Sequence, residues 1–196
     1  SDKTVRRFAA LKPAARDFRI FWDNAYCIHD LNDTPDRLLN IFEACKAAGS
    51  EDLVYEFAST SKVTFPGSGV AVLCMSPANM AWNKKLIASQ TIGSDKLNQI
   101  RHVKFFGDAD GVRAHMQKHR ELIAPKFELL LSTLEKELGG LGIASWTKPN
   151  GGYFFSLNVL PGCAKRVAEL WTRTLAREGI PAYAELTGGY FEAVEV

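Results

Sequence analysis

Three ionisable side chains follow two apolar runs of the sequence and together could bind a cofactor. Asp23 ends the run FRIFWD, Tyr26 comes three residues later, and Lys62 lies in the stretch STSKVTFPGSG, directly after a second apolar run. A carboxylate can hold a protonated ring nitrogen, and a tyrosine hydroxyl can donate to a phenolate oxygen. A lysine that is partly desolvated in a cleft is a nucleophilic amine suited to forming an imine. These requirements together predict a site for pyridoxal phosphate, which proteins hold through a lysine and an acidic partner of its ring nitrogen.

Helix-like and strand-like segments alternate over the first half of the chain, which is typical of an α/β layered sheet. Ligands bind such sheets beyond the carboxyl ends of the strands, where Asp23 and Lys62 are expected. Thr34 is the expected cap of the second helix, Gly49 its stop, and Pro77 suits the first turn of the third. The predicted helices cover residues 4–11, 36–48 and 77–92, and the predicted strands cover residues 18–22, 53–59 and 70–76.

A long helical stretch from Asp108 to Leu138 connects the first half to a smaller α+β unit. Pro125 is expected to kink this helix, because its ring clashes with the carbonyl group four residues earlier. A strand over 151–159, a helix over 163–179 and a short strand over 180–185 are predicted to follow. The chain therefore divides into a first part, 1–107, and a second part, 108–196.

Composition and charge indicate a globular protein with an ordinary core. Of the 196 residues, 46% are hydrophobic and 23% are charged, and the net charge of +2 has its signs interspersed. This balance gives no electrostatic reason to expect nucleic acid or a membrane surface as a partner. No apolar run approaches the ~18 residues of a membrane span, and the polar start SDKTVRRF lacks the apolar core of a secretory signal.

The cysteines and histidines do not predict a metal site. The four cysteines lie far apart among apolar neighbours, so we expect buried, reduced thiols and a cytoplasmic protein. His115 and His119 have the i, i+4 spacing that could chelate a metal on one helix face. Because no third ligand lies at the spacing of a zinc motif, we expect this pair on a solvated helix face.

The motifs around the three ionisable residues resemble those of a known family. DNAY, followed after the next strand by STSK, resembles the fold-type I pyridoxal-phosphate aminotransferases. The tracts STSKVTFPGSGVAVLCMSPANMAW and DKLNQIRHVKFF, with the segment from His119 to Gly162, are similar to the aspartate-aminotransferase-related subgroup Ic. The resemblance runs from about Thr4 to Gly179.

The resemblance implies a role for each residue of the site. Lys62 matches the lysine that binds pyridoxal 5'-phosphate as a Schiff base, and Asp23 matches the partner of the pyridine nitrogen. Tyr26 matches the hydroxyl partner of the ring oxygen, Ser59 matches the hydroxyl that binds the phosphate, and Ser61 would assist it.

The resemblance also implies a fold and a reaction. Residues 1–107 would be the carboxyl-terminal part of a cofactor-binding large domain, and residues 108–196 the linking helix with part of a smaller α+β domain. The full-length protein would be a homodimer that moves an amino group between an amino acid, aspartate-like, and a 2-oxo acid. Lys62 would shuttle the substrate's α-proton as general base and acid.

Two departures from the family pattern limit these expectations. Many members have a phosphate-clamping arginine after the lysine, where this chain has Ser68, Gly69 and Val70, so backbone and hydroxyl donors would have to replace it. A full member is roughly twice as long, consistent with two layered domains. The phosphate loop, the ring-stacking aromatic residue and the substrate-carboxylate arginine are expected outside this chain, so we expect weak cofactor binding and poor turnover in isolation.

Other functions compete for the same residues. Ser59 and Lys62 fit the SxxK pattern of penicillin-recognising acyl-enzyme hydrolases. That chemistry needs an SDN-like element, for which GSDK at 93–96 is a poor substitute, and a KTG strand, which the sequence does not contain. The same fold also occurs as a non-enzymatic ligand-sensing module fused to a DNA-binding domain, although no basic helix-turn-helix is evident here. An inactive remnant is the third alternative.

Overall fold

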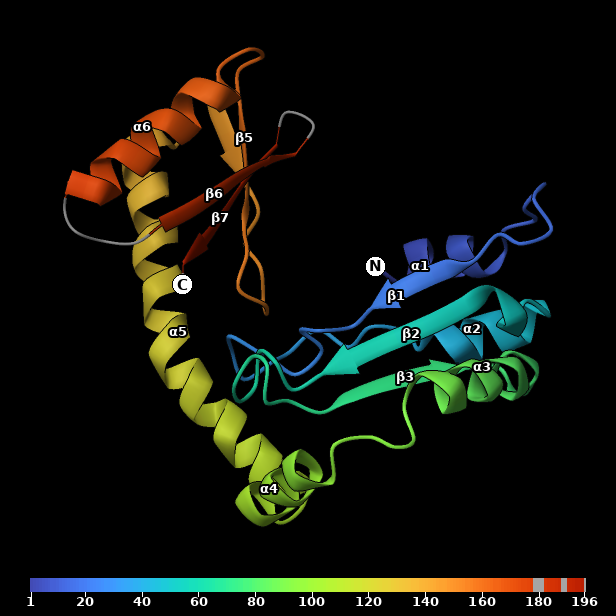
Figure 1. Ribbon diagram of the computed structural model, residues 1–196. Coiled ribbons are helices and arrows are strands. Elements are labelled where there is room, and N and C mark those ends of the chain that lie inside the picture. The colour runs from blue at the N-terminus through green and yellow to red at the C-terminus, as the bar shows by residue number, and fades with distance from the viewer. Residues whose placement is uncertain (178–181, 188–189, 196) are drawn as a thin grey trace. The chain divides into compact units, whose positions relative to one another are not determined.

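The computed structural model describes residues 1–177, 182–187 and 190–195 (Figure 1). It contains two compact units, one formed by Ser1–Cys27 with Arg37–His115 and the other by Ile28–Asp36 with Met116–Val196. The mixture of helices and strands confirms the α/β prediction. The assignment of the two parts of the chain to a large and a small domain stays a proposal.

The first unit contains a three-stranded sheet that brings two strand ends to one edge. Its order is β1 (Ile20–Asp23), β2 (Val54–Ser59) and β3 (Ala71–Met75), with β1 parallel to β2 and β3 antiparallel to it. The register pairs Asp23 with Phe57 and Ser59 with Ala71. The carboxyl end of β2 therefore lies beside the first residue of β3, and the carboxyl end of β1 lies against β2 two residues before the end of that strand. The arrowheads of β1 and β2 point the same way in Figure 1.

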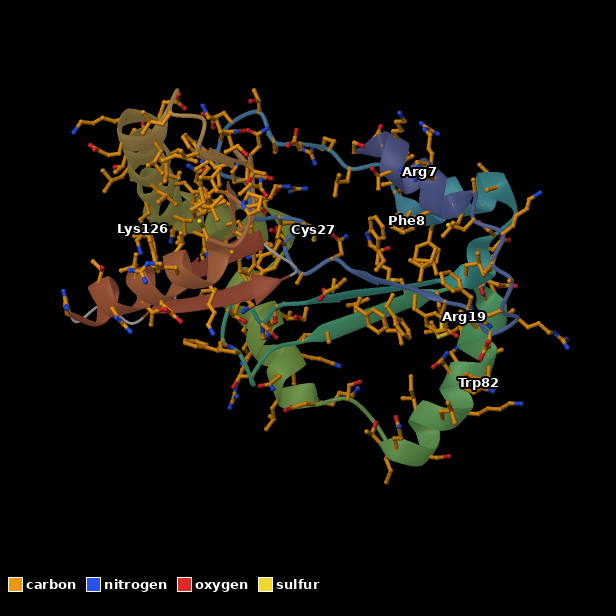
Figure 2. All side chains as sticks on the ribbon, turned by 90° about the horizontal axis from the view of Figure 1, so that it is seen from above. Arg7, Phe8, Arg19, Cys27, Trp82 and Lys126 are labelled. Atoms are coloured by element: carbon orange, nitrogen blue, oxygen red, sulfur yellow. The ribbon has the colours of Figure 1, made fainter. Side chains whose placement is uncertain are left out.

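Helices α1 (Asp2–Ala9) and α2 (Ile41–Ala48) form the core of this unit with one face of the sheet. Phe8 of α1, which is labelled in Figure 2, contacts Trp22 of β1 edge to face, with ring centres 6.1 Å apart. Alternation along the strands explains the choice of face, because Ile20 and Trp22 point to one side and Phe21, which is 72% exposed, points to the other. The buried core residues are Val5, Ala9, Ile20, Ile41, Ala44, Cys45 and Val54.

Helix α2 begins later than the sequence suggested. Its N-cap is Asn40, whose side-chain oxygen accepts hydrogen bonds from the backbone N–H groups of Phe42 and Glu43. The expected cap at Thr34 is wrong, because Asn40 satisfies the first N–H groups of the helix six positions further along. The stop at Gly49 is confirmed, with this glycine in the left-handed conformation at φ +66°.

Two further helices follow β3 in the first unit. Helix α3 (Pro77–Gln90) begins at the predicted proline, after a Ser76 cap. Helix α4 (Lys96–Phe106) was not predicted, and the side chain of Asp95 caps it by accepting from the N–H groups of Leu97 and Asn98. None of its residues is buried, and its half-buried positions include the polar residues Asn98, Gln99 and His102, so the sequence shows no apolar periodicity there.

The second unit combines helices with an antiparallel sheet. Helix α5 (Ala109–Leu138), which starts in the first unit, continues through Pro125 without ending there, and the expected kink stays a prediction. The sheet order is β4-β5-β7-β6, and α6 (Ala164–Arg177) follows β5. Strands β4 and β7 were not predicted. The strands are β4 (Ala144–Trp146), β5 (Ser156–Val159), β6 (Ala182–Thr187) and β7 (Tyr190–Glu195).

The prediction of buried thiols is correct for Cys45 alone. Cys27, labelled in Figure 2, Cys74 and Cys163 are exposed. Cys27 lies in a turn and Cys163 precedes a helix, while Cys74 lies on the edge strand β3. Apolar neighbours in sequence do not bury a side chain, because burial needs a covering element. Among the described residues, no helix is long and apolar enough to cross a membrane.

Candidate active site

Asp23 occupies the last position of β1 and is exposed. The chain stays attached to β2 beyond this point, because the Asn24 N–H donates to the Phe57 carbonyl oxygen at 2.8 Å. The Asn24 side-chain amide also donates to the Glu56 carboxylate, at 2.8 Å. These bonds hold the carboxyl end of β1 against β2 and so fix the position from which the Asp23 side chain extends.

Tyr26 lies in the turn that follows and is half-buried. Burial raises the pKa of its hydroxyl above the usual range, and the negative charge of Asp23 raises this pKa further. The carboxylate of Asp23 therefore lies close enough to the Tyr26 hydroxyl to contribute to its raised pKa. A raised pKa keeps Tyr26 protonated at neutral pH, which is the state that donates a hydrogen bond.

Ser59, Ser61 and Lys62 follow one another at the carboxyl end of β2. Ser59 is the last residue of the strand, and its hydroxyl oxygen lies 3.4 Å from the Ser61 N–H that donates to it. Lys62 lies in the turn that comes next, and its side chain is exposed. The turn is held by its own backbone, because the N–H groups of Val63 and Thr64 both donate to the Thr60 carbonyl oxygen, at 2.9 and 2.8 Å.

The glycines after Lys62 allow the chain to return closely past this turn. Thr60 and Val70 are joined by a backbone hydrogen bond of 2.9 Å, and the Val70 N–H donates to the Thr60 hydroxyl at 2.9 Å. A Cβ atom at Gly69 would lie 2.9 Å from that hydroxyl oxygen and 3.4 Å from the Ser61 nitrogen. Glycine at position 69 therefore lets the chain pass beside the lysine turn without displacing the Thr60 hydroxyl.

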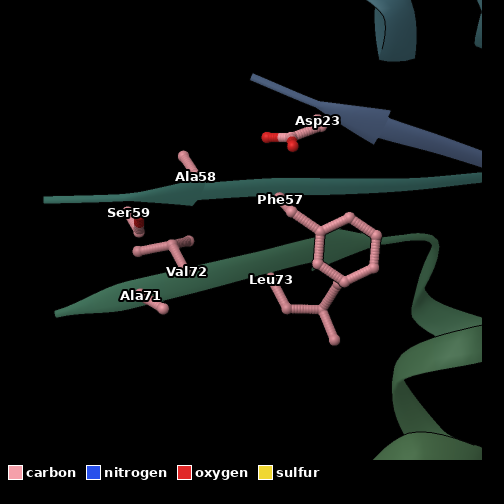
Figure 3. A pocket seen from close by; sticks show the side chains of 7 residues that line it. All are labelled: Asp23, Phe57, Ala58, Ser59, Ala71, Val72 and Leu73. Atoms are coloured by element: carbon pink, nitrogen blue, oxygen red, sulfur yellow. The ribbon is translucent and has the colours of Figure 1, made fainter. Parts of the chain in front are cut away.

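A pocket of about 240 Å³ lies at this edge of the sheet (Figure 3). Asp23 and Ser59, two of the five predicted site residues, are among its lining residues. Its walls are otherwise apolar, and Figure 3 shows Asp23 on β1 together with Phe57 and Ser59 on β2. Pockets for small molecules usually measure about 300–1,000 Å³, so this one is large enough for part of a cofactor. The remaining lining residues are Phe57, Ala58, Ala71, Val72 and Leu73.

The lining residues fit pyridoxal phosphate in chemical type. A carboxylate beside apolar walls suits a planar ring with a protonated nitrogen, and a hydroxyl at a strand end suits a phosphate oxygen. The other three predicted site residues lie in the turns that follow these strands, Tyr26 after β1 and Ser61 with Lys62 after β2. The structure thus places Asp23 and Ser59 at the ends of the paired strands β1 and β2, with Tyr26 in the turn after β1 and Lys62 in the turn after β2.

Two histidines near the lysine turn were missed by the sequence interpretation. The His102 ring contacts the hydroxyls of Thr60 and Thr64, and the His115 ring contacts the Val63 carbonyl oxygen. His115 and His119 were expected on a solvated face, but both are half-buried and His119 contacts the Tyr153 hydroxyl at 3.1 Å. No signal in the sequence connects positions so far apart. Within the described parts of the chain, no group of three or more His, Cys, Asp or Glu residues could hold a metal ion.

Comparisons with known proteins connect this chain with aminotransferases. The family model described as aspartate amino-transferase matches residues 1–174. A relative from Mycolicibacterium smegmatis, named only as an aminotransferase, is 52% identical over 170 residues, which cover 87% of this chain and 40% of the relative. The chain therefore spans less than half the length of this relative.

Solved structures give the same picture. An aspartate transaminase from Corynebacterium glutamicum is 38% identical and superposes with a TM-score of 0.87, covering 100% of this chain and 47% of that one. The α-aminoadipate aminotransferase of Thermus thermophilus, solved with N-(5'-phosphopyridoxyl)-L-leucine, is 20% identical with a TM-score of 0.70, covering 99% of this chain and 48% of that one. At that identity the second likeness concerns the fold.

Proposed function

Because the chain belongs to the aspartate aminotransferase family, we propose that it carries the lysine side of an aminotransferase active site. The whole protein would move an amino group between an aspartate-like amino acid and a 2-oxo acid, with pyridoxal 5'-phosphate as cofactor. The observation that carries this proposal is the pocket that Asp23 and Ser59 line, directly before the turn with Lys62. The phosphopyridoxyl adduct of the Thermus thermophilus relative supports the choice of cofactor.

When bound, pyridoxal phosphate supplies an electron-accepting ring that stabilises negative charge on the substrate's α-carbon. The residues of this chain would have three tasks around it. Asp23 would hold a proton on the ring nitrogen through its negative charge, and Tyr26, whose raised pKa keeps it protonated, would donate to the ring oxygen. Ser59 and the Ser61 hydroxyl would bind phosphate oxygens.

Lys62 would bind the cofactor and would also move a proton. Its amine would take the proton from the α-carbon of the amino acid as general base and would deliver it to the C4′ atom of the cofactor as general acid. The side chain is exposed in this chain, which leaves it accessible to an incoming carbonyl carbon. In the whole protein, residues outside the portion that this chain matches in its relatives would have to cover Lys62 for efficient turnover.

The same proposal includes the organisation of the whole protein. Residues 1–107 would belong to the cofactor-binding large domain and residues 108–196 to the linking helix and part of the small domain. The assembled protein would be a cytoplasmic homodimer. No binding of nucleic acid or membrane is part of this proposal, since the signs of the +2 net charge are interspersed.

Trapping the lysine tests the proposal directly. The 196-residue chain is mixed with pyridoxal phosphate, reduced with borohydride and mapped by mass spectrometry, with Lys62→Ala as the test variant and Lys84→Ala on α3 as the matched control. We expect Lys62 to carry most of the adduct, Asp23→Asn to reduce it, and Lys84→Ala to leave it unchanged. An adduct spread evenly over the exposed lysines would refute the site assignment.

Turnover is expected to be poor even where the adduct forms. Misplacing catalytic groups by about an ångström can cost ~100-fold in rate, and this chain spans 40% of its Mycolicibacterium relative. We therefore expect negligible transamination of aspartate with 2-oxoglutarate by the chain in isolation. Brisk turnover would show that the residues present suffice, or that a second copy supplies the rest.

A further inference from the structure

His102 of α4 connects that helix to the turn that carries Lys62. Its Nε2 atom lies 2.9 Å from the Thr60 hydroxyl oxygen and 2.9 Å from the Thr64 hydroxyl oxygen. Its other nitrogen, Nδ1, lies 2.7 Å from the Asn98 carbonyl oxygen one helical turn earlier. Thr60 and Thr64 flank Lys62 on both sides, so one ring contacts the turn before and after the lysine.

The positions of the hydrogen atoms in this network follow from the atoms that can only accept hydrogen bonds. A carbonyl oxygen can only accept, so Nδ1 of His102 carries the proton that bonds to Asn98. In the neutral ring Nε2 is then an acceptor, and the Thr60 hydroxyl, whose oxygen accepts from the Val70 N–H, donates to it. The Thr64 hydroxyl has a second acceptor, the Thr60 carbonyl oxygen at 3.2 Å. The network therefore joins α4, the lysine turn and the start of the returning chain.

His115, at the start of α5, holds the same turn from another element. Its Nε2 lies 2.8 Å from the Val63 carbonyl oxygen and so donates to it. The rings of Phe105 and Phe106 lie edge to face with the His115 ring, at 5.2 and 5.5 Å between centres. Val63 itself is 4% exposed. The residue directly after Lys62 is thus anchored both by its buried side chain and by its carbonyl group.

We propose that His102 and His115 are positioning residues that hold the Lys62 turn in the orientation its amine needs. This inference rests on the proposed function, because it takes Lys62 as the lysine that binds the cofactor. The long side chain of a lysine can place its amine in many directions. Fixing the backbone on both sides of Lys62 reduces the number of directions that the amine can adopt. The two histidines would act through their contacts with the turn.

The test compares matched variants of each histidine. His102→Leu and His115→Leu remove the ring nitrogens, and His102→Gln keeps an acceptor where Nε2 reaches the threonine hydroxyls. Arg101→Leu is the control for α4, and Gln117→Leu is the control for α5. Arg101 contacts Asn98, Gln117 contacts Glu121, and both are exposed.

Hydrogen exchange of the chain without cofactor gives the first measurement. The Val63, Thr64 and Val70 amides, which all donate within the turn, should exchange about tenfold faster in both leucine variants, from the loss of one or two hydrogen bonds. Exchange at the Val54 and Cys45 amides of the core should stay unchanged, which excludes general unfolding. His102→Gln should restore slow exchange. The proposal would be overturned if these three amides exchanged as slowly in the leucine variants as in the wild type. It would also be overturned if they exchanged as fast in His102→Gln as in His102→Leu.

Trapping with pyridoxal phosphate and borohydride gives the second measurement. The Lys62 share of the adduct should fall at least about fivefold in both leucine variants and remain in both controls, because reaction depends on orientation. A loosened turn with an unchanged Lys62 share would overturn the positioning role while leaving the proposed function intact. A wild-type chain without preference for Lys62 would refute the proposed function itself, and the inference with it.

Discussion

Adding one methyl group at Gly69 should destabilise the first unit through a single contact. The new Cβ would lie 2.9 Å from the Thr60 hydroxyl oxygen, closer than such atoms approach, and 3.4 Å from the Ser61 nitrogen. The hydroxyl cannot move cheaply, because it accepts from the Val70 N–H and also bonds to the His102 ring, both at 2.9 Å. Either the Thr60 side chain or the backbone at residue 69 must therefore shift, which weakens these two hydrogen bonds.

The magnitude follows from two opposing effects on the free energy of unfolding. Overpacking costs about 1–3 kcal/mol, whereas alanine in place of glycine restricts the unfolded chain and returns about 0.4–1 kcal/mol. Gly69→Ala should thus lose roughly 1–2 kcal/mol, a fall of about 0.5–1 M in the urea midpoint at an unchanged slope. Gly93→Ala is the control, since its Cβ would meet nothing within 4 Å, and it should be neutral or slightly stabilising.

A double-mutant cycle identifies the source of the loss. Thr60→Ala removes the hydroxyl that the new Cβ would meet, so Gly69→Ala should cost less than about 0.5 kcal/mol in that background. Urea unfolding followed by circular dichroism measures all four proteins. An equal cost of Gly69→Ala in both backgrounds, or no cost in the wild type, would refute the reasoning.

Three other predictions concern local features of the chain. Asp23→Asn should lower the Tyr26 pKa, measured by ultraviolet titration, but only in part, because burial is the larger cause of its rise. Since the Tyr26 pKa is raised in the folded state, the contribution of Tyr26 to the free energy of unfolding is complete below about pH 10 and should be lost as the pH rises through the folded pKa. A free energy of unfolding that increases over this pH range would contradict the assignment. Asn40→Ala should cost about 1 kcal/mol by removing the α2 cap, whereas Asn40→Ser should retain most of it; equal losses in urea unfolding would exclude capping. Cys45 should react slowly with a disulfide reagent, because it is buried and burial raises the pKa of its thiol, and a fast fourth thiol would contradict the core packing. The three thiols expected to react fast are those of Cys27, Cys74 and Cys163.

Local signals predicted the elements that they themselves stabilise. The Gly49 stop and the Pro77 start depend on the conformation of single residues, and the structure has both. Strands β4 and β7 escaped prediction because β4 is three residues long and β7 pairs with two neighbours that the sequence does not identify. The Thr34 cap failed because several polar residues could cap α2, and the choice among them depends on where the helix packs.

The residues of the candidate site could be predicted from the sequence, since the chemistry of a side chain depends on its residue type and the order of the residues is given by the sequence itself. Asp23, Tyr26, Ser59 and Lys62 could be named before any coordinates, and their adjoining strand ends follow from the parallel pairing of β1 and β2. Only the tertiary structure decided that His102 and His115 hold the lysine turn. Their partners are 38 to 52 positions away in sequence, and such contacts form when separate elements pack, which no local pattern records.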